Sequence, residues 1–259
     1  MQLKKEEIPV FKRFLITGDS LPGLIRKRNE DTFVYAADQD GKYLLTAVAD
    51  GIGGGHNGDI ASTLTCKILL REWRKFQIPK FFINRAIAKF LKKNLSEISD
   101  KIHQLSLLAP RKEIMGTTLA AAVFTEKSVI IIHAGDSRVY RVRQGRIEQL
   151  TIDHNVATDM IRHDKVPEEI AQSHPEGRLL TQAVGPLKKL HPEISIHPLR
   201  SGDRFLFCTD GLTLHVNDQE LCQIITENTD PVETLDDLLE ITYLRGARDN
   251  VTILNVWVI

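Results

Sequence analysis

Two very short turns constrain the fold of this chain most strongly, because each adjoins apolar runs that are rich in β-branched residues. TEKS at 125–128 separates the runs TLAAAVF and SVIIIHA, and QGR at 144–146 follows the run RVYRVR. Strands with so short a connection must pair antiparallel, because a parallel return needs a crossover of about a dozen residues or more. The sequence therefore predicts that much of the sheet structure is antiparallel.

Three further runs have the composition of strands. They are YLLTAVA at 43–49, RFLFCT at 204–209 and VTILNVWVI at 251–259, each rich in β-branched or aromatic residues. A first strand is expected directly after the acidic pair in RKRNED, beginning at TFV.

Helical periodicity marks three segments between these strands. They are the stretch that contains Ile60, Leu64 and Ile68, residues 81–107, and residues 231–244. The third segment has Asp230 as a plausible N-cap and Pro231 at the first helical position. Clusters of strands separated by long helices predict an α+β sandwich rather than a regular β-α-β alternation.

The bulk composition limits the classes of function. The 259 residues are 42% hydrophobic, which suits one domain spanning 1–259. Lys plus Arg number 34 and so do Asp plus Glu, so no overall field draws the chain to nucleic acid or to a membrane surface. The three cysteines form no CxxC pair, and the N-terminal stretch lacks the apolar core of a signal peptide. We therefore expect a cytoplasmic protein with no nucleic acid or membrane partner.

Residues 153–185 differ from the rest of the chain. The segment is polar, contains VPEEIAQS and HPEGRLL, and has helical fragments without a strong core pattern. Such a segment is typical of a surface loop that carries function. We predict a flap here and expect it to govern the choice of substrate.

The glycine loop AVADGIGGGHNG at 47–58 suggests two roles. Gly53, Gly55 and Gly58 satisfy the GxGxxG spacing of a dinucleotide-binding loop. That loop needs a second strand ending in an acidic residue about 20 positions further on, whereas here the predicted helix continues into REWRKFQIPKFF. The alternative is that Asp50, at the end of a strand, holds a metal ion with the Gly51 carbonyl close to it.

Acidic residues recur at the ends of the predicted strands. They are Asp50, Asp136, Asp210, Asp249 and the pair Glu30 and Asp31. Carboxylate sets suit hard cations such as Mg²⁺ and Mn²⁺, whereas zinc favours His or Cys ligands in recognisable spacings. The nine histidines form no HExxH or similar pair. The pattern therefore predicts a magnesium or manganese site.

Eight motifs in order resemble the type 2C metal-dependent Ser/Thr protein phosphatases. They are RKRNED, VADGIGGGHNGDIAS, MGTT, AGDSRVYR, QLTIDHN, LLTQAVG, FLFCTDGL and DNVT, and the resemblance extends from about residue 16 to the C-terminus. It implies a four-layer αββα fold, in which two mostly antiparallel sheets are flanked by helices. It also implies hydrolysis of phosphoserine and phosphothreonine in proteins by direct attack of a water activated by two divalent metals, Mn²⁺ or Mg²⁺.

The resemblance assigns roles to the strand-end acids. By motif, Asp50 is expected to bridge both metals, Asp210 and Asp249 to complete one site, and the Gly51 carbonyl to complete the other. Glu30 and Asp31 are expected to hold or orient waters on the metals. Two cations about 3.5–4 Å apart lower the pKa of a shared water and neutralise the phosphate that it attacks.

Three further residues receive roles by motif. Arg26 matches the phosphate-binding arginine of the family, and Asp136 matches an acid that supports a third, weaker metal in bacterial members. Many bacterial members have DGMGGH where this chain has DGIGGGH, so Gly55 stands in the place of their histidine. His56 remains a candidate general acid, because the pKa of histidine suits protonation of a serine leaving group.

The alternatives leave different traces in a sequence. A cysteine phosphatase needs an arginine six positions after the nucleophile, but Glu72, Leu214 and Asn228 occupy those positions here. A non-catalytic relative that binds a phosphoprotein should have lost metal ligands, whereas every expected carboxylate remains. We expect a monomer that acts on phosphorylated proteins, as the partner of a Ser/Thr kinase and its targets.

Overall fold

The computed structural model describes residues 10–11, 13–38, 40–53, 57–108 and 114–259. The strands are β1 (Val10–Phe11), β2 (Phe14–Leu21), β3 (Thr32–Ala37), β4 (Leu44–Ala49), β5 (Gly51–Ile52), β6 (Gly116–Thr117), β7 (Leu119–Phe124), β8 (Ser128–Ala134), β9 (Arg138–Arg143), β10 (Arg146–Gln149), β11 (Glu193–Pro198), β12 (Arg204–Cys208) and β13 (Val251–Val258). The helices are α1 (Asn57–Lys75), α2 (Ile83–Leu108), α3 (Val156–Arg162), α4 (Glu168–Ser173), α5 (Asp210–Thr213), α6 (Asp218–Glu227) and α7 (Pro231–Leu244).

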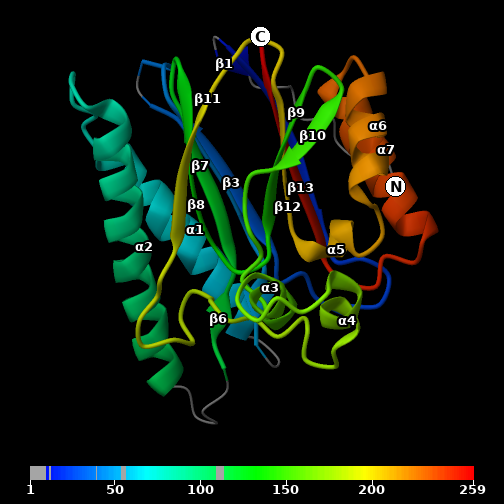
Figure 1. Cartoon of the computed structure of the whole chain (residues 1–259). Coiled ribbons are helices and arrows are strands. Elements are labelled where there is room, and N and C mark those ends of the chain that lie inside the picture. Colours follow the sequence, from blue (N-terminus) through cyan, green and yellow to red (C-terminus); the bar gives the residue numbers. More distant parts are fainter. Residues whose placement is uncertain (1–9, 12, 39, 54–56, 109–113) are drawn as a thin grey trace.

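Within these residues the longer strands form two sheets that face each other (Figure 1). The first has the order β1-β2-β13-β12-β9-β10 and the second β11-β8-β7-β4-β3. Neighbouring strands in both sheets pair antiparallel. The turn between β9 and β10 has Gln144 at φ 52° and Gly145 at φ 70°, as in the two-residue hairpin turns that match the twist of a sheet.

Three apolar layers hold the sandwich together. One lies between the second sheet and the pair α1 and α2, and another lies between the first sheet and the pair α6 and α7. The central layer lies between the sheets and includes Phe14, Phe124, Phe205 and Phe207. The helices thus cover the two outer faces in Figure 1, which confirms the predicted four-layer α+β sandwich.

The predicted elements agree with the structure where the apolar pattern was strong. Helix α7 begins at Pro231, and the Asp230 carboxylate caps it by accepting a hydrogen bond from the Val232 amide at 2.7 Å. The strand predicted at TFV is present as β3, but it is not the first strand, because β2 precedes it and pairs with β13 along its whole length. Gly18 and Asp19 interrupt the apolar pattern of β2, so its pairing in the sheet and not its local propensity makes it a strand. Strand β11 and helix α6 were also missed.

The segment at 153–185 folds around the two short helices α3 and α4. The Asn155 side chain caps α3 by accepting a hydrogen bond from the Thr158 amide at 2.9 Å. Backbone hydrogen bonds run from Val156 to Leu179 and from Ala157 to Gly177, so the segment closes on itself. In Figure 1 it lies at one end of the sandwich, across the ends of the strands. In the part of the chain that the structure describes, no helix is both long and apolar enough to pass through a bilayer.

Replacing Phe124 by alanine should destabilise the fold by about 3–5 kcal/mol, because it opens a cavity between the two sheets. The ring is fully buried, and its centroid lies 5.5 Å from that of Phe14 and 5.0 Å from that of Phe205. Urea unfolding measures the change. Phe81→Ala is the control, since that ring is 77% exposed, and an equal loss in both variants would contradict the central position of Phe124.

Candidate active site

The sheet pairing brings the strand-end acids to one edge of the sandwich. Asp50 follows β4 and Asp31 precedes β3, and these neighbouring strands pair Thr32 with Ala49. Asp136 follows β8, Asp210 follows β12, and Asp249 lies two residues before β13. Burial raises the pKa of Asp50 well above its usual value, and the charges of the other four aspartates raise it further. The five predicted aspartates therefore form one carboxylate cluster.

Two glycines allow the backbone around the cluster to pack closely. A Cβ on Gly211 would lie 1.9 Å from the Asn250 carbonyl oxygen, so the backbone after Asp210 fits against the residue after Asp249 only without a side chain. A Cβ on Gly51 would lie 2.3 Å from the Gly58 carbonyl oxygen. Both Asp-Gly pairs are therefore required by the close approach of two chain segments.

Asp31 is the most completely enclosed of these acids. The hydroxyls of Thr209 and Thr252 donate hydrogen bonds to its Oδ2, at 2.7 and 2.8 Å. Its Oδ1 is buried and has no partner among the described residues. Burial raises the pKa of Asp31 to about 7, and the charges of Asp210 and Asp249 add to the shift while the two hydroxyls oppose it. A buried carboxylate oxygen without a partner is costly, so the site fits a cation or a water that a cation holds.

The pKa values of two other acids in the cluster are also raised. Burial raises the pKa of Asp136 to about 7, with the charge of Asp210 as the next cause. Burial also raises the pKa of Asp210, and the Asp249 charge raises it further. Like charges at such a site favour protonation unless cations neutralise them, and oxygen-only donors suit Mg²⁺ or Mn²⁺.

Threonine hydroxyls fix the backbone of the cluster. The Asp50 amide donates to the Thr118 hydroxyl at 2.9 Å, and the Thr117 hydroxyl donates to the Asp50 carbonyl at 2.8 Å. The Thr118 hydroxyl also lies 2.6 Å from that of Ser137, which follows Asp136. Thr118 thus holds Asp50 and the Asp136 turn in one arrangement, and the two threonines position the site rather than react.

Asn250 ties the loop after β2 to the cluster. Its side-chain Nδ2 donates hydrogen bonds to the backbone carbonyls of Pro22 and Arg28, at 3.0 and 2.8 Å. Its side-chain Oδ1 accepts a hydrogen bond from the backbone amide of Glu30 at 2.9 Å. The Arg26 guanidinium pairs with Asp249 at 2.6 Å, and this hydrogen bond raises the pKa of Arg26. Burial raises the pKa of Glu30, and the charge of Asp59 on α1 adds to it. Arg26 and Glu30 thus lie at the edge of the cluster.

Three residues that organise the site were not predicted from the sequence. Thr209, Asn250 and Thr252 hold Asp31 and the loop in place, and each lies within three residues of a predicted acid. Their position inside the motifs CTDG and DNVT was the available signal. His56 lies outside the described residues, so its role stays a prediction.

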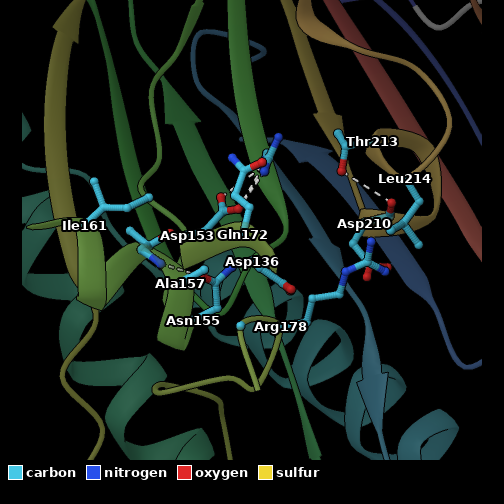
Figure 2. Close-up of a pocket in the computed structure, with 13 residues that line it drawn as sticks. Asp136, Asp153, Asn155, Ala157, Ile161, Gln172, Arg178, Asp210, Thr213 and Leu214 are labelled. Carbon is cyan, nitrogen blue, oxygen red and sulfur yellow. Dashed lines mark hydrogen bonds and ion pairs between the residues drawn. The ribbon is translucent and has the colours of Figure 1, made fainter. Parts of the chain in front are cut away.

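A pocket of about 310 Å³ opens beside the cluster (Figure 2). Asp136 and Asp210 line it from the sheets, and Thr158, Gln172 and Arg178 line it from the segment at 153–185. In Figure 2 the Arg178 side chain extends toward Asp210. The segment that was predicted as a flap therefore forms one wall of a cavity whose other wall is the carboxylate cluster.

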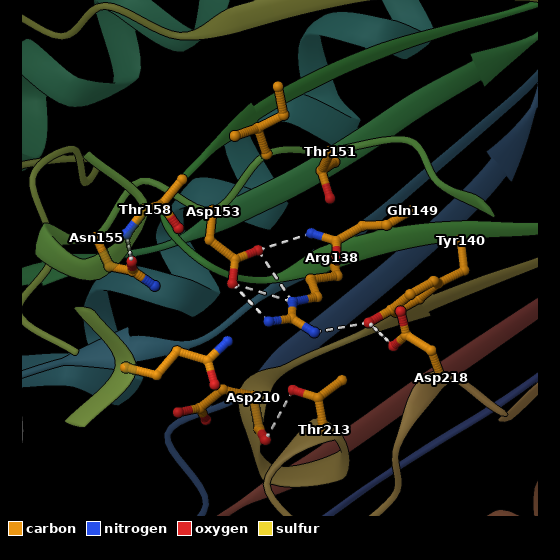
Figure 3. Close-up of polar contacts among 12 residues, drawn as sticks. Arg138, Tyr140, Gln149, Thr151, Asp153, Asn155, Thr158, Asp210, Thr213 and Asp218 are labelled. Atoms are coloured by element: carbon orange, nitrogen blue, oxygen red, sulfur yellow. Dashed lines mark hydrogen bonds and ion pairs between the residues drawn. The ribbon is translucent and has the colours of Figure 1, made fainter. Parts of the chain in front are cut away.

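A second polar network supports this pocket (Figure 3). Arg138 donates to both carboxylate oxygens of Asp153, at 2.7–3.1 Å, and to the Tyr140 hydroxyl at 2.7 Å. The Tyr140 hydroxyl donates to Asp218 on α6 at 3.0 Å. Arg138 lies two residues after Asp136, so the network fixes the base of the flap relative to the cluster.

His133, His154 and Glu193 form another group that could hold a metal, with ligand atoms within 4.8 Å of one another. The two imidazole rings are stacked, with centroids 4.6 Å apart and planes 12° from parallel. Ligand lone pairs lie in the ring plane, so parallel rings do not converge on one ion. His133 Nε2 also lies 2.8 Å from the Ile152 carbonyl oxygen, and burial lowers the pKa of both histidines. The two histidines are therefore a stacked pair of rings in which burial disfavours the protonated form.

The two-sheet sandwich with a carboxylate cluster at its edge is the arrangement that the resemblance to metal-dependent phosphatases predicts. The family model for protein phosphatase 2C matches residues 26–242. The chain therefore belongs to the protein phosphatase 2C family and is a metal-dependent protein-serine/threonine phosphatase.

Individual relatives agree with this assignment. The serine/threonine phosphatase stp of Listeria monocytogenes is 31% identical over 234 residues, which is 90% of this chain and 92% of the relative. The solved serine/threonine phosphatase of S. agalactiae has a TM-score of 0.89 at 28% identity and covers 95% of this chain and 100% of its own. The catalytic domain of the phosphatase PstP, solved with two manganese ions, has a TM-score of 0.79 at 27% identity and covers 95% of this chain and 99% of its own.

Without metal, the stability of the folded protein should fall as the pH rises from about 4 to about 7. The folded state keeps protons on Asp31 and Asp136 up to pH about 7, whereas the unfolded chain releases them near the usual 3.8. Urea unfolding in EDTA at pH 5 and pH 8 measures this difference. Asp31→Asn should reduce the dependence of stability on pH. A wild-type stability at pH 8 that equals or exceeds that at pH 5 would contradict the raised pKa values of Asp31 and Asp136.

Proposed function

We propose that the carboxylate cluster binds two divalent cations, Mn²⁺ or Mg²⁺, and that the protein hydrolyses phosphoserine and phosphothreonine in proteins with water as the attacking group. The observation that carries this proposal is the buried Asp31 Oδ1, which has no partner among the described residues and lies among aspartates whose burial and mutual repulsion raise their pKa values. Such a cluster is stable in its ionised form only with cations beside it.

The proposal assigns each predicted ligand a place. Asp50 would bridge the two cations, Asp210 and Asp249 would complete one site, and the Gly51 carbonyl would complete the other. Glu30 and Asp31 would orient waters, and Asp136 would support a third, weaker cation. When bound, the cations supply a nucleophilic water near neutral pH and neutralise charge on the phosphate.

The remaining steps belong to side chains of this chain. Arg26 is more than half exposed and lies at the cluster edge through its ion pair with Asp249. Its planar guanidinium fits two oxygens of a phosphate and would orient the substrate for in-line attack. Thr209 and Thr252 would keep Asp31 in one rotamer while it accepts a hydrogen bond from water. His56 is the candidate donor of the proton to the leaving serine or threonine oxygen.

The proposal also covers the domain organisation, the location and the partners of the protein. We propose that residues 1–259 form a single catalytic domain in which 153–185 is a flap subdomain. We also propose a cytoplasmic monomer that acts on the targets of a Ser/Thr kinase. A non-catalytic phosphoprotein-binding role is the alternative, and the complete set of strand-end acids argues against it.

Removal of metal should abolish the hydrolysis of a phosphothreonine peptide and of p-nitrophenyl phosphate, because the attacking water would no longer be activated. Asp210→Asn should lower kcat at least about 100-fold, since it removes a charged cation ligand. The assays compare Mn²⁺, Mg²⁺ and EDTA. Asp236→Asn on the exposed face of α7 is the control, and wild-type turnover that persists in EDTA would refute the mechanism.

Replacing Arg26 by alanine should lower kcat/KM for phosphopeptides by roughly 10- to 100-fold, because it removes charge-assisted hydrogen bonds to the phosphate. Steady-state kinetics measure this loss. Lys27→Ala, which removes a neighbouring exposed cation, should retain activity. If both variants lost the same activity, the effect would reflect the general positive charge of the loop.

A further inference from the structure

The pocket beside the carboxylate cluster has an unequal distribution of charge. Among its lining residues, Arg138 and Asp153 neutralise each other through three hydrogen bonds. Asp136 and Asp210 belong to the cluster that the proposed function assigns to cations. Among the lining residues that the structure describes, the remaining charge is the guanidinium of Arg178.

The backbone around Arg178 is held in place by hydrogen bonds of its neighbours. Its neighbours Gly177 and Leu179 accept backbone hydrogen bonds from Ala157 and Val156, at 2.9 and 3.0 Å, so this part of the flap is anchored to the start of α3. The Arg178 side chain makes no hydrogen bond or ion pair with any residue that the structure describes. It extends into the pocket toward Asp210 (Figure 2), close enough that its charge acts on that carboxylate.

Two arginines therefore flank the cluster from different parts of the fold. Arg26 reaches it from the loop after β2 through Asp249, and Arg178 reaches it from the flap beside Asp210. The charge of Asp249 also acts on Asp210, so these two carboxylates lie near each other, with Arg26 paired to Asp249 and Arg178 near Asp210. If Arg26 takes the phosphate, Arg178 is left facing the part of the substrate that lies next to the phosphorylated residue.

We infer that Arg178 is a specificity-determining residue that binds an anionic side chain within two residues of the phosphoserine or phosphothreonine. This inference rests on the proposed function. An extended peptide rises about 3.3 Å per residue, so a neighbouring side chain reaches the pocket while the phosphate lies at the cluster. A guanidinium pairs with either a carboxylate or a second phosphate, and both share the chemistry that this position recognises.

The test compares phosphothreonine peptides that carry Gln, Glu or Lys at one position, scanned from two residues before to two residues after the phosphothreonine. The wild-type protein in Mn²⁺ should prefer Glu over Gln by about 3- to 10-fold in kcat/KM at one or more positions. Arg178→Ala should bring this ratio close to one. Arg178→Glu should reverse it in favour of Lys, and Arg178→Lys should keep part of the preference.

A binding measurement separates recognition from turnover. Fluorescence anisotropy with non-hydrolysable phosphonate analogues of the same peptides, with Gln, Glu or a second phosphonate at the favoured position, should give the same order of affinities. The two anionic arms show whether a carboxylate or a second phosphate is the better partner. The preference for an anionic peptide should weaken as the salt concentration rises, because the ion pair between Arg178 and the peptide is partly exposed to solvent.

Arg162→Ala is the matched control, since Arg162 lies on α3 of the same flap and pairs with Glu193 at 3.4 Å outside the pocket. It should retain the wild-type ratio. The inference is overturned if wild type shows no preference, or if Arg178→Ala lowers kcat/KM for all peptides by one factor, which would place Arg178 on the common phosphate. If wild type hydrolyses no phosphopeptide in Mn²⁺, the proposed function itself fails.

Discussion

The site depends on one buried carboxylate that joins the two sheets. Asp31 precedes β3 of the second sheet, and its Oδ2 accepts hydrogen bonds from Thr209, directly after β12, and from Thr252 in β13 of the first sheet. A buried carboxylate destabilises a fold unless polar groups satisfy it, so these contacts fix how closely the two sheet edges approach. The other oxygen of Asp31 has no partner among the described residues. The Asp31 side chain therefore sets the shape of the cluster, and its second oxygen leaves a buried negative charge that a cation would neutralise.

Much of this structure could be predicted from local patterns in the sequence. Short turns and β-branched runs predicted antiparallel strands, and Asp230 with Pro231 predicted the start of α7. The acids could be recognised because each ends or precedes an apolar run. What could not be predicted depends on pairing between distant segments. The Asp31 contacts span 178 and 221 residues of sequence, and β2 becomes a strand through β13, so no local window contains the cause.

The flap shows how polar contacts replace an apolar core. Its short helices bury little beyond small side chains such as Ala157 and Ala171, and its shape comes from backbone hydrogen bonds and the Asn155 cap. The Arg138–Asp153 pair then joins its base to the sheet that carries Asp136. A segment held in this way accepts changes in its exposed side chains without loss of the fold, which suits a surface that discriminates between substrates.

The position of β13 links completion of the first sheet to completion of the carboxylate cluster. This strand lies between β2 and β12 inside its sheet, although it follows every other described element in the chain. Asp249 lies two residues before it, and Thr252 lies within it. A chain still emerging from the ribosome therefore lacks a central strand and part of its reactive centre together. Without this strand the cluster lacks the Thr252 hydroxyl that holds Asp31 and the Asp249 charge beside Asp210, so sheet and reactive centre are completed in one step.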